Sequence, residues 1–162
     1  MDEQTLPADA GSEQVIRYYA DLVWHLAFAR TGSRNDADDI FQEVFLRYVR
    51  KKPHFHSEEH RKAWLIRVTV NCAKSFHESA RMRKMQPLQE NLVWEDPETH
   101  SLHDELQRLP PRYRDVIHLF YYEGFSTDEI ADILHRKNST VRTQLTRARA
   151  MLRAFMEEDE NV

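Results

Sequence analysis

The stretch STDEIADILHRKNSTVRTQLTRARAMLR, residues 126–153, decides the fold of the C-terminal half of the chain. Ser126, followed three residues later by Glu129, is typical of a capping box that opens a short helix. The polar residues HRKN at 135–138 predict a turn, after which Ser139 can cap a last helix. Apolar residues recur at helical spacing in that last helix: Val141, Leu145, Ala148, Leu152 and Phe155. A short helix, a turn of about four residues and a longer helix predict a helix-turn-helix, whose second helix can enter the major groove of DNA.

The last helix is basic, although the formal net charge of the chain is -4. At 100° per residue, Arg142, Arg149 and Arg153 lie together, away from the apolar stripe and on an open face. Side chains of the first turns are placed to reach base edges, which predicts contacts from Ser139, Thr140, Arg142, Thr143 and Gln144. Phosphate contacts are predicted for Lys137, Arg147 and Arg149. The alternative is a solvated basic helix with no nucleic-acid partner.

Composition and charge define the domain organisation. Only three glycines and a charged fraction of 31% favour helices among 162 residues, so we expect an all-α fold with two small helical domains. Residues 86–105 contain six acids and no Lys or Arg, whereas the segments 53–85 and 106–156 are both positive. We therefore predict domains at 12–85 and 101–157, joined by an acidic linker at 86–100.

The acidic linker also contains the apolar residues Leu92, Val93 and Trp94, which either dock on a neighbouring domain or contact a partner. The N-terminus has neither a secretory signal nor a membrane-spanning run, and Cys72 is the lone cysteine. These features predict a cytoplasmic protein without membrane insertion.

The first domain is predicted to contain three helices. The first contains Val15, Tyr19, Leu22, Val23, Leu26 and Ala27 at helical spacing and should end at the TGS sequence, residues 31–33. The second should run from about Ala37 to Lys51, capped by Asn35. The third should begin near Ser57 and end near Arg81, burying Leu65, Val68, Thr69, Cys72 and Phe76. In the second domain, we expect a helix over about 102–108 and another from Pro111 whose inward residues are Val116, Ile117, Phe120 and Tyr121.

Two surfaces of the first domain are candidates for binding. The outward side of the second helix carries Asp39, Gln42, Glu43 and Leu46, which is typical of a docking surface for another protein. A stray apolar surface residue is the alternative explanation for Leu46.

The third helix and the loop before it combine aromatic rings, cations and amides, which suits unstacked bases and their phosphates. The candidate residues are Lys52, His54, Phe55, His56, Trp64, Arg67, Asn71 and Lys74. Trp64 can also simply cover the core.

Three stretches resemble the sigma subunits of bacterial RNA polymerase, specifically the extracytoplasmic-function group of the sigma-70 family. DADDIFQEVFLRYVRK at 36–51 resembles the region 2 helix that docks on the polymerase clamp helices, and RKAWLIRVTVNCAKSF at 61–76 resembles the helix that reads the -10 element. LPPRYRDVIHLFYYEGFSTDEIADIL at 109–134, with STVRTQLTRARAMLR at 139–153, resembles region 4, which binds the -35 element and the polymerase flap. The similarity covers about residues 13–156.

The resemblance implies a transcription initiation factor that is not an enzyme and needs no cofactor or metal. Its partners would be core RNA polymerase, through the β′ clamp helices and the β flap, and promoter DNA, with an anti-sigma factor as a further candidate. The 51–60 loop would hold a base flipped from the -10 element. The chain departs from the family pattern in the polar HRKN turn, at Ser75 where Asp is common, and at Glu78 within a usually basic stretch.

Two other functions remain open at this point. A helix-turn-helix regulator independent of polymerase would use the second domain but leave the surfaces of the first domain without a role. A metal-binding module would use His54, His56 and His60, with Cys72 as a fourth candidate ligand, although no carboxylate pair or nucleophile accompanies them.

Overall fold

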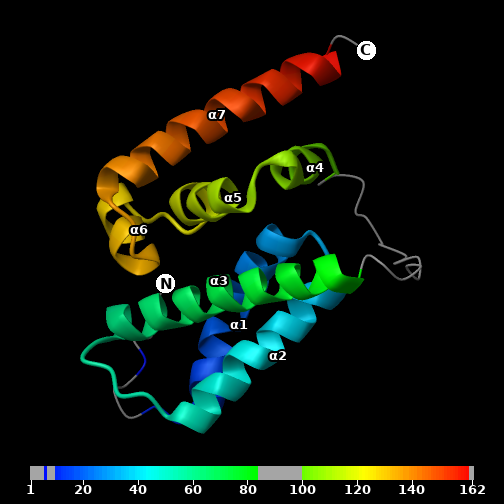
Figure 1. The fold of residues 1–162 in the computed structure, drawn as a ribbon. Coiled ribbons are helices and arrows are strands. Elements are labelled where there is room, and N and C mark those ends of the chain that lie inside the picture. The colour runs from blue at the N-terminus through cyan, green and yellow to red at the C-terminus, as the bar shows by residue number, and fades with distance from the viewer. Residues whose placement is uncertain (1–5, 7–9, 84–99, 161–162) are drawn as a thin grey trace. The chain divides into compact units, whose positions relative to one another are not determined.

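The structure is a computed structural model that describes residues 6, 10–83 and 100–160, without the side chains at 77–83, 100–103 and 159–160. All regular elements of this described part are helices (Figure 1). In chain order they are α1 (Ser12–Thr31), α2 (Arg34–Lys51), α3 (Glu58–Arg83), α4 (His100–Arg108), α5 (Pro111–Ile117), η1 (His118–Tyr122), α6 (Thr127–Leu134) and α7 (Asn138–Glu160). The chain divides into two compact units: unit 1 contains residues 1–28 and 34–86, and unit 2 contains 29–33 and 87–162.

Unit 1 is held together by one apolar cluster to which α1, α2 and α3 all contribute. Its buried members are Val15, Tyr19, Val23, Ala27, Ala37, Ile40, Val44, Phe45, Tyr48, Leu65, Cys72 and Ala73. Leu22, Val68 and Phe76 pack against this cluster while remaining partly exposed. The helical spacing of apolar residues therefore predicted the inward faces of all three helices.

The partly buried carboxylate of Glu58 joins α1 to the start of α3. The Tyr19 hydroxyl donates to Glu58 Oε2 at 2.7 Å, and Arg61 pairs with the other oxygen of the same carboxylate. Burial and the neighbouring Glu58 raise the pKa of Tyr19, so its hydroxyl remains a donor at neutral pH. The backbone N–H of His60 donates to Ser57 Oγ at 3.1 Å, which confirms that Ser57 opens the helix.

The second helix begins three residues earlier than expected, at Arg34 instead of Ala37. Asp38, inside the helix in both cases, accepts a 2.7 Å hydrogen bond at Oδ1 from Trp24 Nε1 of α1. Trp24 in turn stacks on Phe28, with ring centroids 5.1 Å apart. Asp38 thus makes a side-chain contact between α1 and α2 that the spacing of residues along the sequence does not predict.

In unit 2, α5 and α6 both pack against α7, and α4 contacts α5 and α7. The capping box at the start of α6 is confirmed: Glu129 N donates to Ser126 Oγ, and Ser126 N donates to Glu129 Oε1, each at 3.1 Å. Val141, Leu145 and Ala148 are buried on the inward face of α7. The helix-turn-helix order predicted from the sequence is present.

The prediction that Tyr121 faces inward is wrong. After Ile117 the chain forms the π-helical turn η1, which inserts extra residues into the helical repeat. Leu119 is fully buried, Phe120 is half-buried, and Tyr121 is 60% exposed as a result. Gly124, with φ of 76°, then ends the helix as expected.

Some sequence features lie outside the described residues. They are the apolar linker residues Leu92, Val93 and Trp94, most of the predicted linker at 86–100, and the side chain of Glu78. Within the described part, no helix is long and apolar enough to cross a membrane.

Candidate functional site

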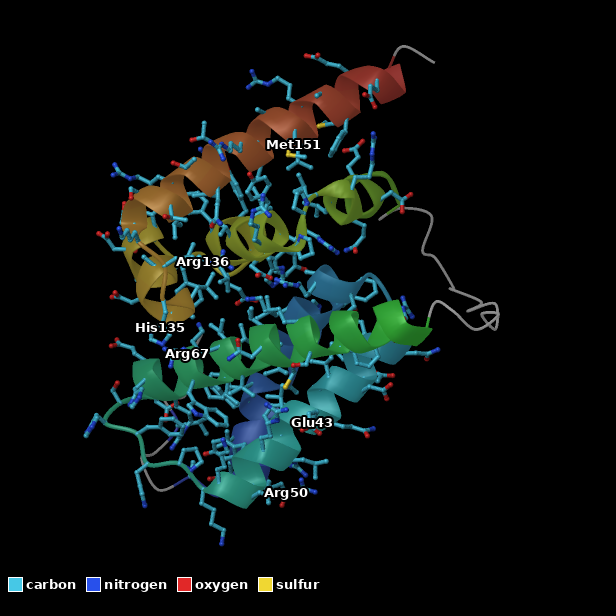
Figure 2. The ribbon with its side chains drawn as sticks, viewed as in Figure 1. Glu43, Arg50, Arg67, His135, Arg136 and Met151 are labelled. Atoms are coloured by element: carbon cyan, nitrogen blue, oxygen red, sulfur yellow. The ribbon has the colours of Figure 1, made fainter. Side chains whose placement is uncertain are left out.

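The polar turn of the helix-turn-helix is fixed by its own side chains. His135 ends α6 in the left-handed conformation, with φ of 54° and ψ of 47°, which a non-glycine residue rarely adopts. Arg136 N donates to Ala131 O at 3.0 Å, and the Arg136 guanidinium donates to Gln144 Oε1 at 3.0 Å and to Arg112 O at 3.2 Å. Figure 2 shows His135 and Arg136 side by side at this corner. Arg136 therefore connects the turn to both α5 and α7.

Two further contacts hold the turn. Arg136 Nη2 lies 3.5 Å from Asp115 Oδ2, and Asp115 is almost fully buried. Burial is the main cause that lowers the pKa of Arg136, and Asp115 opposes this effect. On the other side of the turn, Asn138 donates through Nδ2 to Thr127 Oγ1 at 3.2 Å and to Asp128. The HRKN sequence thus replaces the expected glycine and apolar residues with a polar network.

The residues predicted to contact duplex DNA divide into exposed and buried groups. Seven of the eight are exposed: Lys137, Ser139, Thr140, Arg142, Thr143, Arg147 and Arg149. Gln144 is only 9% exposed, because it packs inward and accepts the hydrogen bond from Arg136. Ser139 also lies one residue inside α7, which begins at Asn138.

One side of α7 borders a shallow hollow of about 320 Å³. Its lining residues come from α5 and α7: Arg112, Tyr113, Ser139, Thr140, Thr143, Gln144 and Arg147. The side chains of Arg112 and Arg147 lower the pKa of Tyr113. The Arg112 Cζ lies 4.8 Å from the centroid of the Tyr113 ring. Cations beside the first turns of a long helix make this hollow electrostatically suited to a phosphate.

Arg112 and Tyr113 were not among the predicted DNA-binding residues. In the sequence, the cationic stretch RYR at 112–114 follows two prolines. The prolines predicted the start of α5, but nothing in the sequence predicted which helix these residues would contact. Packing of α5 against α7 brings them to Arg147.

On the opposite flank of the helix, Arg149 is held against aromatic rings. Its Nε donates to the Tyr121 hydroxyl, and its Cζ lies 5.5 Å from the Phe120 ring centroid and 5.4 Å from that of Tyr121. The exposure of Tyr121 that the π-helical turn creates is therefore what allows this contact.

In unit 1, the predicted single-strand surface has an aromatic centre. Phe55 stacks on Tyr48 with nearly parallel rings, and Trp64 meets both of these rings edge to face at 5.9 Å. Phe55 and Trp64 are half-buried and pack on the core, so Trp64 covers the core, and its role towards nucleic acid stays a prediction. Lys52 begins the loop with φ of 43°, a left-handed conformation that turns the chain after α2.

The polar members of this surface surround the rings. Lys52, His54, His56, Asn71 and Lys74 are exposed, and Arg67 is partly exposed. Figure 2 shows Arg67 projecting from α3. His56 stacks on His60, and His60 meets Phe55 edge to face at 5.2 Å. Loop and helix therefore present cations and ring edges on one unit, as an unstacked nucleic-acid strand requires.

The outward face of α2 has the predicted residues and one additional ion pair. Asp39, Gln42 and Leu46 are exposed, and Leu46 retains 46% of its accessible surface. Glu43 is partly exposed and pairs with Arg47, which donates from Nε at 2.9 Å. Val49, 41% exposed, extends the apolar part of this face. Figure 2 shows Glu43 and Arg50 along α2.

The histidines considered as metal ligands do not form a ligand set with Cys72, which is buried in the core of unit 1. Among the described residues, no three His, Cys, Asp or Glu side chains are grouped as a metal ion would need.

Comparison with known proteins connects both units to one family. Residues 15–83 match the model for Sigma-70 region 2, and residues 99–152 match the model for Sigma-70, region 4. A sigma-E factor of the extracytoplasmic-function (ECF) type from Haemophilus influenzae is 32% identical over 146 residues, which cover 76% of each chain. The chain belongs to the ECF group of RNA polymerase sigma factors.

Other relatives agree with this ECF assignment. The ECF sigma factor SigE of Mycolicibacterium smegmatis is 32% identical over 89% of this chain, which spans 61% of the length of that relative. The fold is similar to that of the sigma factor RpoE from Bartonella quintana, solved in complex with the anti-sigma factor NepR, with a TM-score of 0.72. That similarity covers 90% of this chain and 96% of the other, at 19% identity. Unit 1 is thus a sigma region 2 domain, and unit 2 is a sigma region 4 domain.

Proposed function

We propose that this ECF sigma factor binds core RNA polymerase, recognises the -10 and -35 promoter elements and initiates transcription. The observation that carries the proposal is the presence of both sigma regions, in order, each with exposed residues of the required chemistry. The proposal divides the chain into a region 2 domain at 12–85, a linker at 86–100 and a region 4 domain at 101–157.

Duplex recognition at the -35 element is assigned to the exposed face of α7. Ser139, Thr140, Arg142 and Thr143 would face base edges, while the neighbouring cations Lys137, Arg147 and Arg149 would face phosphates. The inward packing of Gln144 favours a supporting role beneath this face.

Recognition of the -10 element is assigned to the aromatic centre of unit 1 and the polar residues around it. Stacking of an unpaired base on Phe55 or Trp64 would offset the cost of unstacking that base, which is about a few kcal/mol. Lys52, His54, His56, Arg67, Asn71 and Lys74 would contact the base and its backbone.

The exposed face of α2 is proposed to bind the β′ clamp helices of core polymerase. Leu46 would supply the apolar contact, and Asp39, Gln42 and Glu43 the polar rim, a combination typical of protein interfaces. Region 4 would contact the β flap. The chain would act by binding and not by catalysis, in the cytoplasm, and an anti-sigma factor would be a regulatory partner, as NepR is of the Bartonella protein.

The test is run-off transcription with purified core polymerase on genomic DNA, followed by mapping of the transcript start sites. We expect start sites that share two sequence elements and depend on the added chain. A chain that binds duplex DNA but supports no transcription would favour the polymerase-independent regulator.

Two substitutions then separate the surfaces. Arg142→Ala should reduce transcription from promoters with an intact -35 element by about tenfold, since loss of one base or phosphate contact costs about 1–3 kcal/mol. Leu46→Ala should weaken binding to core polymerase. The dependence of transcription on the -35 sequence should stay unchanged in this variant. Asp132→Ala, an exposed change in α6, serves as the control. Unchanged activity in both test variants would contradict the site assignments.

A further inference from the structure

The flank of α7 that carries Arg149 has a feature that the proposed contacts do not use. Tyr121 and Tyr122 are among the most exposed large hydrophobic side chains described, at 60% and 68%. Tyr122 lies on His118, with ring centroids 5.0 Å apart. Tyr121 instead accepts a hydrogen bond from Arg149, whose Cζ lies 5.5 Å from the ring centroid of Phe120 and 5.4 Å from that of Tyr121.

This contact orders Arg149 without neutralising it. The hydrogen bond uses Nε, so the two terminal nitrogens Nη1 and Nη2 remain as donors. In the part of the chain that the structure describes, no carboxylate pairs with Arg149. A guanidinium held on rings loses less side-chain entropy when it binds than one that is free in solvent.

The geometry of a helix in the major groove gives this ordered cation a target. A phosphate strand borders each side of the groove, so both flanks of an inserted helix face phosphates. On α7, Arg147 lies on the flank of the hollow with Arg112, and Arg149 lies on the flank of Tyr121. Arg147 would therefore face the phosphates of one DNA strand, and Arg149 those of the other.

We propose that Tyr121 and Phe120 are positioning residues that hold Arg149 against a backbone phosphate of the strand on its side of the -35 element. This inference rests on the proposed function and adds a residue pair to its region 4 site. Phe120 supplies the ring face, and the Tyr121 hydroxyl fixes the direction in which the Nη donors point. The π-helical turn has a role here, because it turns Tyr121 outward.

The test measures binding of the holoenzyme to a mapped promoter fragment over a range of salt concentrations. Arg149→Ala should weaken binding by about tenfold and reduce the slope of log K against log salt by about 0.9, as expected for one lost phosphate contact. Tyr121→Ala should weaken binding by about threefold to fivefold. Tyr121→Phe, which keeps the ring and the fold, should weaken it by about twofold.

A double-mutant cycle separates positioning from a general structural effect. In the Arg149→Ala background, Tyr121→Ala should change affinity by less than about twofold, because the group that it positions is absent. Tyr122→Phe, which removes the hydroxyl of the neighbouring exposed tyrosine, is the matched control and should leave binding unchanged. Equal losses from Tyr121→Ala in both backgrounds, or no loss from either Tyr121 variant, would overturn the inference. If the wild-type chain supports no promoter-dependent transcription, the proposed function fails before this test begins.

Discussion

Both units bury apolar side chains, but among the described residues unit 2 buries more polar ones. Unit 1 is built from helices of 20, 18 and 26 residues around an apolar cluster, and its buried polar residues are Arg61 and Thr69. In unit 2, the helices before α7 are short: α4 has nine residues, α5 has seven, η1 has five and α6 has eight. Its buried polar residues on these helices and α7 are Glu105, Arg114, Asp115, His118 and Gln144.

The two units also differ in helix length. Each helix end leaves about four backbone N–H or C=O groups without a partner, so short helices require more capping and side-chain hydrogen bonds per residue. Long helices expose fewer ends and can close an apolar core. Both units therefore pack apolar side chains, such as Leu65 in unit 1 and Leu119 in unit 2, and unit 2 adds polar contacts around its recognition helix.

The largest expected effect tests the apolar core of unit 1. Leu65→Ala removes a fully buried side chain from the cluster and should lower the free energy of unfolding by about 2–5 kcal/mol. Urea unfolding followed by circular dichroism measures this change. Leu46→Ala is the matched control, since the same atoms are removed from a side chain 46% exposed, and it should cost about 0.5 kcal/mol or less. Equal losses in the two variants would contradict the packing described here.

The next effect tests the polar turn of unit 2. Arg136→Met keeps an unbranched side chain of similar reach but removes the donors to Gln144 and to Arg112 O. We expect a loss of about 1–3 kcal/mol, because buried acceptors lose their hydrogen bonds. The exposed neighbour gives the control, Lys137→Met, which should leave the unfolding midpoint nearly unchanged. A neutral Arg136→Met would mean that the turn does not need its polar network.

A smaller effect compares two serines that the sequence placed at helix starts. Ser126→Ala breaks the capping box and should cost about 1 kcal/mol. Ser139→Ala should cost less, since α7 begins at Asn138 and Ser139 lies within its first turn. Thermal unfolding of both variants provides the measurement, and the opposite order would place the start of α7 at Ser139.

The smallest effect uses Cys72 as a reporter of unit 1. Burial raises the pKa of its thiol, so the folded state favours the neutral form. The resulting stability is fully present below the ordinary thiol pKa and is lost as pH rises through the raised value. Iodoacetamide should therefore label native protein at pH 8 far more slowly than protein in urea.

The same labelling distinguishes the units. Leu65→Ala should accelerate modification of Cys72 by making unit 1 open more often, whereas Ser126→Ala should not. Acceleration by both variants would show that the two units unfold together. Cys72 is the lone cysteine, so each labelled molecule reports this site.

Local signals in the sequence predicted most of the fold. Apolar periodicity identified the inward faces of α1, α2 and α7, and Ser57 and Ser126 marked the starts of α3 and α6. The candidate surfaces followed from the same periodicity, since residues opposite an apolar stripe are exposed. The assignment of individual contacts to polymerase and DNA remains a prediction.

The failures occurred where a distant contact or a change of helical register decided the outcome. Trp24 donates to Asp38, fourteen positions along the chain, and α2 begins at Arg34, before its expected start at Ala37. The π-helical turn moved Tyr121 from the predicted inward position to the surface. Gln144 belonged to the polar side of a helical pattern but was drawn inward by Arg136.

By itself the sequence determined the all-α class, the helix-turn-helix order and the exposed basic face of α7, because these depend on spacing and capping within a few residues of each other. Only the tertiary structure decided that the HRKN turn is held by Arg136, that Arg112 joins Arg147 at the hollow, and that Tyr121 meets Arg149. Each of these contacts joins residues of different structural elements. Their partners are set by helix packing and by the position of the π-helical turn, neither of which local spacing encodes.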